Sequence, residues 1–173
     1  MTINENFFFK TLSSPEFTEK YRAIRHELHK QPETAFKEVQ TASLIARHLE
    51  SLGIDIHQGM AETAVIGTLR KGTSKRTIGL RADMDALDMD EENTFSHRSA
   101  VPGKMHGCGH DGHTTMLLAA AEILAGEVTF DGTVHFVFQP AEENEGGGRR
   151  MVEEGLFEKF PMDAIFGMHN IPG

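Results

Sequence analysis

Residues 105–116 read M-H-G-C-G-H-D-G-H-T-T-M and hold three histidines, one aspartate and the single cysteine of the chain. Thiolate and imidazole are both good ligands for transition metals, and Cys108 lies only two residues before His110. The glycines around them permit a tight backbone path on which both side chains can point at one ion. The alternative is that Cys108 is a small buried hydrophobic residue and the histidines are solvated. The cluster has no accompanying C-x-x-C pair, which disfavours a structural zinc finger.

A pair of carboxylates offers a second set of reactive groups. Glu142 and Glu143 lie in the segment Q-P-A-E-E-N-E-G-G-G, directly after a segment expected to be a strand. In a turn, one carboxylate can bind a metal while its neighbour takes a proton from the water that the metal activates. This division of work suits metal-assisted hydrolysis. The competing interpretation is a solvated acidic loop, since charged runs are usually exposed.

Spacing connects these residues with His169, which follows a further strand, expected to be buried, at 163–168. His110 and Glu143 are 33 residues apart, and Glu143 and His169 are 26 apart. Each gap accommodates one helix and one strand, about one crossover unit of an α/β sheet. Ligand sites of open α/β sheets lie outside the carboxyl ends of the strands. We therefore expect Cys108, His110, Glu143 and His169 to converge, although a lone histidine there would more often be structural.

Two aspartates occupy a comparable position. Asp83 and Asp85 belong to R-A-D-M-D-A-L (81–87), which follows the strand expected at 76–82. Either they orient metal-bound histidines from behind, or they cap the loop. The segment H-E-L-H (26–29) resembles a zincin motif but is one residue short, so we interpret it as an ordinary helix surface.

The elements that must position these residues follow from apolar periodicity and from turn residues. The expected fold class is α/β, a three-layer sandwich with a mixed sheet flanked by helices. The strands at 64–69 and 76–82 are expected to form a hairpin, and 86–104 is expected to be a long loop. Helices are expected at 15–30, 36–52 and 113–125 and just after E-G-G-G (145–148), and strands at 64–69, 76–82, 133–138 and 163–168.

Bulk composition excludes several classes of protein. The chain has 173 residues, 39% hydrophobic and 25% charged, as expected of one ordinary globular domain. Its net charge of −9 argues against a nucleic-acid partner, and its apolar runs are too short to span a membrane. The N-terminal residues lack the pattern of a secretory signal, and a single cysteine cannot form an internal disulfide. We therefore expect a cytoplasmic protein.

Five segments together resemble the metal-dependent amidohydrolases of the aminoacylase and carboxypeptidase G superfamily. Within it they resemble the branch of hippurate hydrolase and the auxin-conjugate hydrolases. The segments occur in the family's order and spacing and cover nearly all of the chain. They are R-H-E-L-H-K-Q-P-E (25–33), R-A-D-M-D-A-L (81–87), P-G-K-M-H-G-C-G-H-D-G-H-T (102–114), F-Q-P-A-E-E-N-E-G-G-G (138–148) and G-M-H-N-I-P-G (167–173).

The resemblance implies a zinc-exopeptidase-like catalytic domain that hydrolyses the amide bond of N-acyl amino acids. It implies two divalent ions, with manganese, zinc, nickel and cobalt all compatible with the mixed ligand set. It makes Glu142 the general base, and it makes Cys108, His110, Glu143 and His169 the ligands. Asp111 and His113 are left with supporting roles beside these ligands, as are Asp83 and Asp85.

The chain also departs from the family's pattern. Asp88 replaces a usual proline, and Lys104 replaces a smaller or apolar residue. Family members are more than twice as long and add a dimerising domain and a last histidine ligand, so residues 1–173 resemble only the N-terminal portion of the catalytic domain. The alternatives are therefore a catalytically inactive metal-binding fragment or a non-enzymatic binding module. An incomplete sheet would also expose an apolar edge, which predicts self-association or aggregation.

Overall fold

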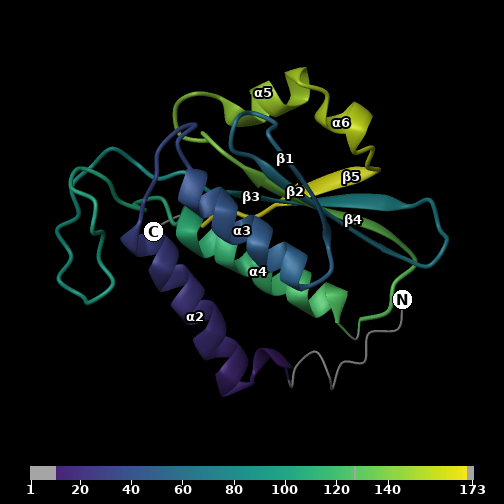
Figure 1. The fold of residues 1–173 in the computed structure, drawn as a ribbon, viewed down its shortest axis with the longest axis horizontal. Helices are drawn as coiled ribbons and strands as arrows, with labels where there is room; N and C mark the ends of the chain where they lie inside the picture. The colour runs from purple at the N-terminus through teal and green to yellow at the C-terminus, as the bar shows by residue number, and fades with distance from the viewer. Residues whose placement is uncertain (1–10, 127, 171–173) are drawn as a thin grey trace.

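The computed structural model describes residues 11–126 and 128–170, so the ends of the N- and C-terminal segments analysed above, 1–10 and 171–173, lie outside it. In the described residues, two helices and then three strands precede a part of the chain in which helices and strands alternate, as in α/β proteins (Figure 1). The elements are α2 (Pro15–Lys30), α3 (Val39–Ser51), β1 (Asp55–Gln58), β2 (Val65–Lys71), β3 (Thr77–Asp83), α4 (His110–Ala125), β4 (Gly132–Gln139), α5 (Gly147–Glu153), α6 (Leu156–Lys159) and β5 (Ala164–Gly167).

A five-stranded mixed sheet in the order β1-β2-β4-β3-β5 forms the middle layer. The expected hairpin of β2 and β3 is wrong, because β4 lies between them, antiparallel to β2 and parallel to β3. Nearly every residue of β4 is buried, which suits a central strand. Asp131, just before β4, accepts hydrogen bonds from the backbone N–H groups of Thr73 and Ser74 in the turn between β2 and β3. This turn therefore closes over the start of β4.

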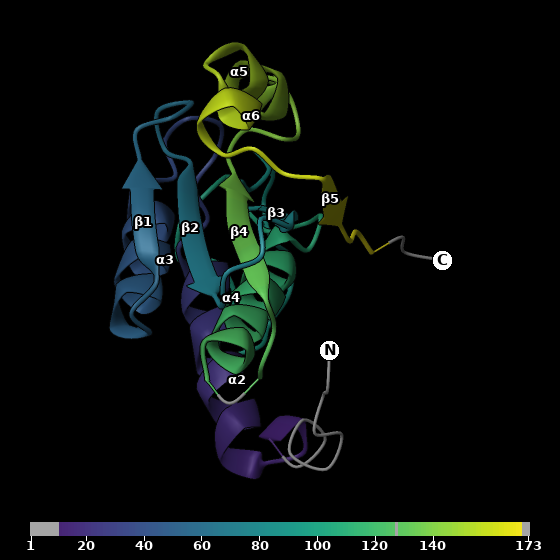
Figure 2. The same ribbon diagram turned by 90° about the vertical axis from the view of Figure 1, so that its right-hand side faces the viewer.

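Helices cover both faces of the sheet, which confirms the three-layer arrangement. Helices α2, α3 and α4 lie on one side, while α5 and α6 lie on the other (Figures 1 and 2). The larger core packs α2–α4 against one face and includes Tyr21, Leu49, Leu118 and Phe136. A smaller core lies under α5 and α6 and includes Ile66, Val137, Met151 and Leu156. Alternate residues of β4 thus enter different cores, as the period of a strand requires.

Several boundaries differ from expectation for local reasons. Helix α3 begins at Val39, not at residue 36, because Phe36 has a positive φ of 58°. Val39, the first residue of this helix, is 59% exposed. Strand β1 is polar apart from Ile56, so its sequence carries no clear strand signal. Strand β5 is not buried as expected, because it is an edge strand with β3 as its partner and its residues are mostly exposed.

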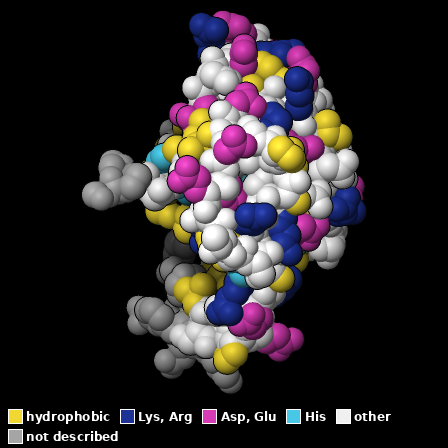
Figure 3. Space-filling view, turned by 90° about the vertical axis from the view of Figure 1, so that its left-hand side faces the viewer, with side chains coloured by type: hydrophobic (Ala, Val, Ile, Leu, Met, Phe, Trp, Pro, Cys, Tyr) yellow, Lys and Arg dark blue, Asp and Glu magenta, His cyan; other side chains and the backbone are white. Residues whose placement is uncertain are grey.

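The three parallel strands β4, β3 and β5 bring their carboxyl ends to one edge of the sheet. The segment between β3 and α4 is the expected long loop, and it is closed at its base by a bridge between Leu87 and Met105. The two departures from the family pattern pair with each other beside this bridge, since Lys104 Nζ lies 2.8 Å from Asp88 Oδ1. The end of the molecule at the left of Figure 1 shows basic and acidic side chains interspersed (Figure 3). None of the helices described is long and apolar enough to cross a membrane.

Candidate metal centre

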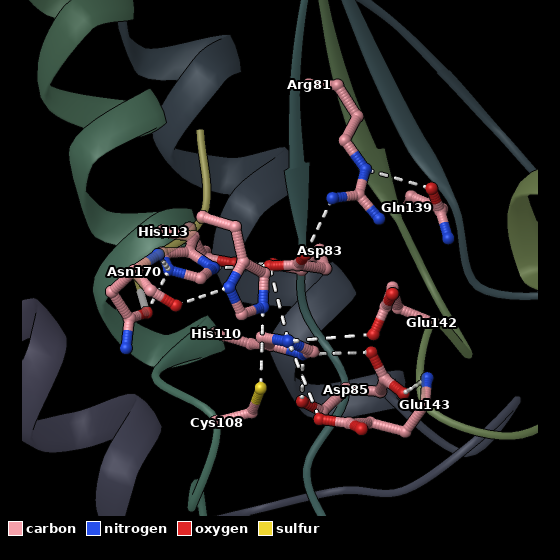
Figure 4. A network of polar contacts seen from close by, with 12 residues as sticks. Arg81, Asp83, Asp85, Cys108, His110, His113, Gln139, Glu142, Glu143 and Asn170 are labelled. Atoms are coloured by element: carbon pink, nitrogen blue, oxygen red, sulfur yellow. Dashed lines mark hydrogen bonds and ion pairs between the residues drawn. The ribbon is translucent and has the colours of Figure 1, made fainter. Parts of the chain in front are cut away.

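His110 lies at the centre of a polar cluster at this edge of the sheet (Figure 4). It is the first residue of α4, where the sequence predicted a position just before the helix, and its side chain is fully buried. Its Nδ1 lies 2.9 Å from the backbone oxygen of Asp85 and 3.1 Å from Asp85 Oδ1. A carbonyl oxygen can only accept, so Nδ1 carries the hydrogen and donates it. The other ring nitrogen, Nε2, is therefore the one available as a ligand.

The turn after β4 presents the two glutamates to His110. Glu143 Oε1 lies 3.6 Å and Glu142 Oε2 lies 3.9 Å from His110 Nε2. The backbone N–H of Glu143 donates to Asp85 Oδ2 at 3.0 Å, so Asp85 holds both His110 and this turn. Burial opposes the ionisation of Asp85, but these hydrogen bonds keep its pKa below the usual range. The adjacent carboxylates are both directed towards the cluster, as metal-assisted hydrolysis requires.

A buried glutamate that the sequence did not single out supports the same turn. Glu38 is fully buried and accepts hydrogen bonds from the backbone N–H of Ala141, at 3.0 Å, and from Thr63 Oγ1, at 2.7 Å. Burial raises the pKa of Glu38. Ala141 adopts a positive φ of 52°, which redirects the chain just before Glu142. Glu38 lies about a hundred residues away in sequence, so no local pattern could have identified it.

Cys108 and His169 complete the cluster from two different segments. Cys108 Sγ lies 3.4 Å from His169 Nε2. Burial, together with the hydrogen bond to Glu143 and the negative charges of Glu143, Glu142 and Asp83, raises the pKa of the Cys108 thiol to about 12. The thiol therefore stays protonated near neutral pH unless a cation offsets the surrounding carboxylates.

Unpaired atoms in the cluster test whether it fits a metal ion. Potential ligand atoms of Cys108, His110 and Glu143 lie within 4.8 Å of one another. Among residues 11–126 and 128–170, His110 Nε2 and Glu143 Oε1 are buried and have no hydrogen-bond partner. Buried polar atoms are rarely left unpaired, so each of these two needs a partner that the described residues do not supply. A divalent cation bound by sulfur, nitrogen and oxygen matches this set.

Electrostatics at His110 favour a cation at the same place. Burial alone would lower the pKa of His110, but the hydrogen bond to Asp85 and the charges of Asp83, Asp85 and Glu143 outweigh it and raise the pKa. The same negative charges that favour a proton on Nε2 favour a metal ion there. The residues present therefore fit a bound divalent metal.

A second group of possible ligands adjoins the first. Potential ligand atoms of Asp83, His110, His113 and His169 also lie within 4.8 Å of one another. His113 Nδ1 lies 2.6 Å from Asp83 Oδ1, and Arg81 donates to Asp83 Oδ2 at 2.6 Å. These two residues are thus already engaged in hydrogen bonds, unlike His110 Nε2.

Asp111 faces away from this cluster, although it was expected to support the ligands. Its Oδ2 lies 2.9 Å from His29 Nδ1 and 3.2 Å from Arg25 Nε, both on α2. The other ring nitrogen of His29 lies 3.0 Å from Glu91 Oε1 in the long loop. The interpretation of H-E-L-H as helix surface is therefore wrong for His29, which is buried between two carboxylates. Helical spacing could not reveal this, because both partners lie far away in sequence.

Sequence comparison identifies the family. The model of peptidase family M20/M25/M40 matches residues 79–173, more than half of the chain. The chain belongs to this family. The matched region holds the strand ends and the whole cluster around His110.

Two relatives illustrate the similarity. Hippurate hydrolase of Campylobacter jejuni is 48% identical over 153 residues, which cover 88% of this chain and 40% of the relative. An IAA-amino acid hydrolase of Arabidopsis thaliana, ILR1-like 4, is 48% identical over 147 residues, which cover 84% of this chain and 33% of the relative. The chain therefore spans well under half the length of these relatives.

Two solved structures are also similar to this chain over less than half of their own length. The YXEP protein of Bacillus subtilis, described as a dinuclear metal binding peptidase from the M20 family, superposes with a TM-score of 0.87 at 38% identity. The match covers 92% of this chain and 45% of that structure. A putative aminohydrolase from methicillin-resistant Staphylococcus aureus superposes with a TM-score of 0.88 at 34% identity. That match covers 96% of this chain and 44% of the other. The expected fold class is confirmed.

Proposed function

We propose that this chain forms the metal-binding part of an amidohydrolase that cleaves the amide bond of N-acyl amino acids. The observation that carries the proposal is the pair of buried, unpartnered atoms His110 Nε2 and Glu143 Oε1, with Cys108 Sγ beside them. We assign Cys108, His110, Glu143 and His169 as ligands. The family membership and the dinuclear metal binding ascribed to the Bacillus subtilis protein support two divalent ions. Manganese, zinc, nickel and cobalt all suit this donor set.

Glu142 is the general base in this proposal. Its side chain is 38% exposed, more than the 21% of Glu143, and points towards the ligand atoms from the open side. A divalent ion held by Cys108, His110, Glu143 and His169 would polarise the substrate carbonyl and lower the pKa of water beside it. Glu142 takes the proton as this water attacks the carbonyl carbon, and then delivers it to the nitrogen of the leaving amino acid. Asp85 keeps His110 and Glu143 in place throughout, through the hydrogen bonds described above.

The proposed substrate class comes from the relatives. The names of both similar enzymes, hippurate hydrolase and IAA-amino acid hydrolase, describe the hydrolysis of an acyl group joined to an amino acid. We propose the same class here, acted on in the cytoplasm, where Cys108 stays reduced. We propose no nucleic-acid partner, in view of the net charge of −9. A homodimer is proposed for full-length relatives.

The test of Glu142 is its replacement by glutamine, which keeps the shape of the side chain and removes the base. We expect Glu142→Gln to lower the hydrolysis of hippurate at least about 100-fold while the bound metal is retained. Glu145→Gln is the matched control, because Glu145 is an exposed glutamate of the same loop. Undiminished hydrolysis in Glu142→Gln, measured in a protein that turns over the substrate, would show that another group is the base.

The runner-up proposal is an inactive metal-binding fragment, favoured by the coverage of only 40% and 33% of the two relatives. Metal analysis combined with a hippurate assay of the 173-residue chain separates the two. Bound metal without turnover supports the fragment, and bound metal with turnover supports the enzyme. A non-enzymatic binding module of the same fold is supported only if Cys108→Ser and His169→Ala leave the metal content unchanged.

A further inference from the structure

A chain of hydrogen bonds runs from β3 to the segment that carries His169 (Figure 4). Arg81 binds Asp83, and Asp83 binds His113 Nδ1, as described above. The other ring nitrogen of His113, Nε2, lies 2.5 Å from Asn170 Oδ1 and 3.3 Å from the backbone nitrogen of Asn170. Both ring nitrogens of His113 are thus engaged, and both oxygens of Asp83 have partners. This series of hydrogen bonds ends at Asn170, the residue directly after His169.

Gly109 provides the space into which Asn170 fits. A Cβ atom at position 109 would lie 2.7 Å from Asn170 Oδ1, closer than real Cβ contacts allow. Gly109 also has a φ of +91°, a conformation that other residues rarely adopt. The side chain of Asn170 therefore rests on the backbone between Cys108 and His110. This contact docks the segment after β5 onto the start of α4.

The segment that follows β5 needs such an anchor. β5 is a four-residue edge strand, and Phe166 and Met168 are 59% and 69% exposed. Within the described residues, the side-chain hydrogen bonds of positions 168–170 go to Cys108, to His113 and within the segment itself. His169 Nδ1 lies 2.6 Å from the backbone oxygen of Asn170, so the placement of Asn170 also orients the imidazole ring.

We propose that Asn170 is a positioning residue for His169, held in place by His113 and Asp83. In this arrangement Asp83 and His113 do not bind metal. Arg81 balances the charge of Asp83, and the hydrogen bonds through His113 hold Asn170, and with it the neighbouring ligand His169, in place. The proposal rests on the metal site proposed above and adds to it the residue that keeps the fourth ligand within reach of Cys108.

A double-mutant cycle with Co²⁺ as the probe tests this proposal on the 173-residue chain. The affinity for Co²⁺ and its visible absorption spectrum are measured for the wild type, Asn170→Ala, His169→Ala and the double variant. We expect Asn170→Ala to weaken Co²⁺ binding about 10-fold and to change the visible bands, because outer partners of ligands typically contribute this much. In the His169→Ala background, Asn170→Ala has no further effect. Met168→Ala is the control, since it alters an exposed neighbour outside the hydrogen-bond chain.

The outcomes distinguish a failure of the positioning role of Asn170 from a failure of the metal site. An equal loss from Asn170→Ala with and without His169 overturns the positioning role, because the effect then does not pass through His169. Unchanged affinity and spectrum in Asn170→Ala also overturn it. Absence of Co²⁺ binding to the wild type, or binding unaffected by Cys108→Ser, overturns the metal site itself and this proposal with it. Circular dichroism melts of all variants identify any that fail to fold.

Discussion

The state of Cys108 depends on whether a cation is present. Burial and the neighbouring carboxylates raise the pKa of its thiol to about 12, so the metal-free protein holds a thiol, and metal binding must release its proton. We predict that the affinity for Zn²⁺ rises by at least about tenfold per pH unit near neutrality, because the Cys108 thiol releases one proton and a His110 ring protonated at Nε2 releases another. Titration calorimetry in buffers of different ionisation enthalpy measures this release directly. Affinity that is independent of pH between about 6 and 8 would argue against a thiolate ligand.

His29 links α2, α4 and the long loop through a buried charge. The hydrogen bond to Asp111, aided by the one to Glu91, outweighs burial and raises the pKa of His29. Two carboxylate partners require two N–H donors, and only the protonated ring has both. Burial opposes the ionisation of both carboxyl groups. The hydrogen bonds from the Ser99 backbone and from His29 nevertheless lower the pKa of Glu91 to about 2, and the hydrogen bond from His29 lowers the pKa of Asp111 to about 2.

The sign of these shifts sets the expected pH profile of stability. The contribution of His29 is complete below its ordinary pKa of about 6.5 and is lost as pH rises through the raised value. The contribution of Glu91 and Asp111 is complete above about pH 4 and is lost as pH falls towards 2. We predict that His29→Gln lowers the free energy of unfolding by about 3 kcal/mol at pH 6, since it leaves a buried carboxylate unpaired. Urea unfolding across pH measures this, and a deficit that does not shrink as pH rises above 7 would contradict it.

At the scale of elements, local patterns predicted most helices and strands, though not β1, and they did not predict how the strands pair. The periodicity of Tyr21 and Leu28 indicates α2, and the alternation of Val134, Phe136 and Phe138 indicates the strand β4 but not its central place in the sheet. The pairing of β2 with β4 is non-local, so the adjacent strands β2 and β3 suggested a hairpin that does not exist. The exposure of β5 was missed for the same reason, because an apolar strand has the same sequence pattern at an edge as in the middle of a sheet.

The start of α4 depends on a glycine, which gives a prediction with a matched control. Gly109→Ala introduces both an unfavourable positive φ and a collision with Asn170. Gly103→Ala, in the loop before it, introduces a positive φ of +72° with no atom within 4 Å. We expect both to destabilise the protein by about 1–2 kcal/mol from the backbone conformation alone. Only Gly109→Ala should also weaken Co²⁺ binding, and equal affinities in the two variants would contradict this.

At the scale of the whole molecule, the exposed edge of the sheet predicts self-association. Ile165, Phe166 and Met168 are 40%, 59% and 69% exposed on or next to β5. Unpaired strand edges with apolar side chains favour pairing with another chain. We predict concentration-dependent oligomers in sedimentation velocity, reduced by Phe166→Lys. Phe157→Lys, on α6, is the control because Phe157 is also exposed, at 40%. A monodisperse wild-type monomer that unfolds cooperatively would refute this.

The convergence of the four proposed ligands was predictable from chain spacing, because Glu143 and His169 follow the ends of parallel strands and His110 begins the helix between β3 and β4. The residues that support the ligands were less predictable. Glu38 and Asn170 act through contacts with distant segments, and their types and neighbours in sequence carry no signal of that role. Asp111 has the correct spacing but points to the opposite side of α4.

The central claim is that Cys108, His110 and Glu143 hold a divalent metal ion. Elemental analysis of the purified, metal-equilibrated chain tests it most directly, with the wild type compared with Cys108→Ser. We predict at least one equivalent of divalent metal in the wild type and a clear loss in Cys108→Ser, with both proteins folded. A wild-type chain without metal, or a Cys108→Ser variant with undiminished metal, would contradict the claim.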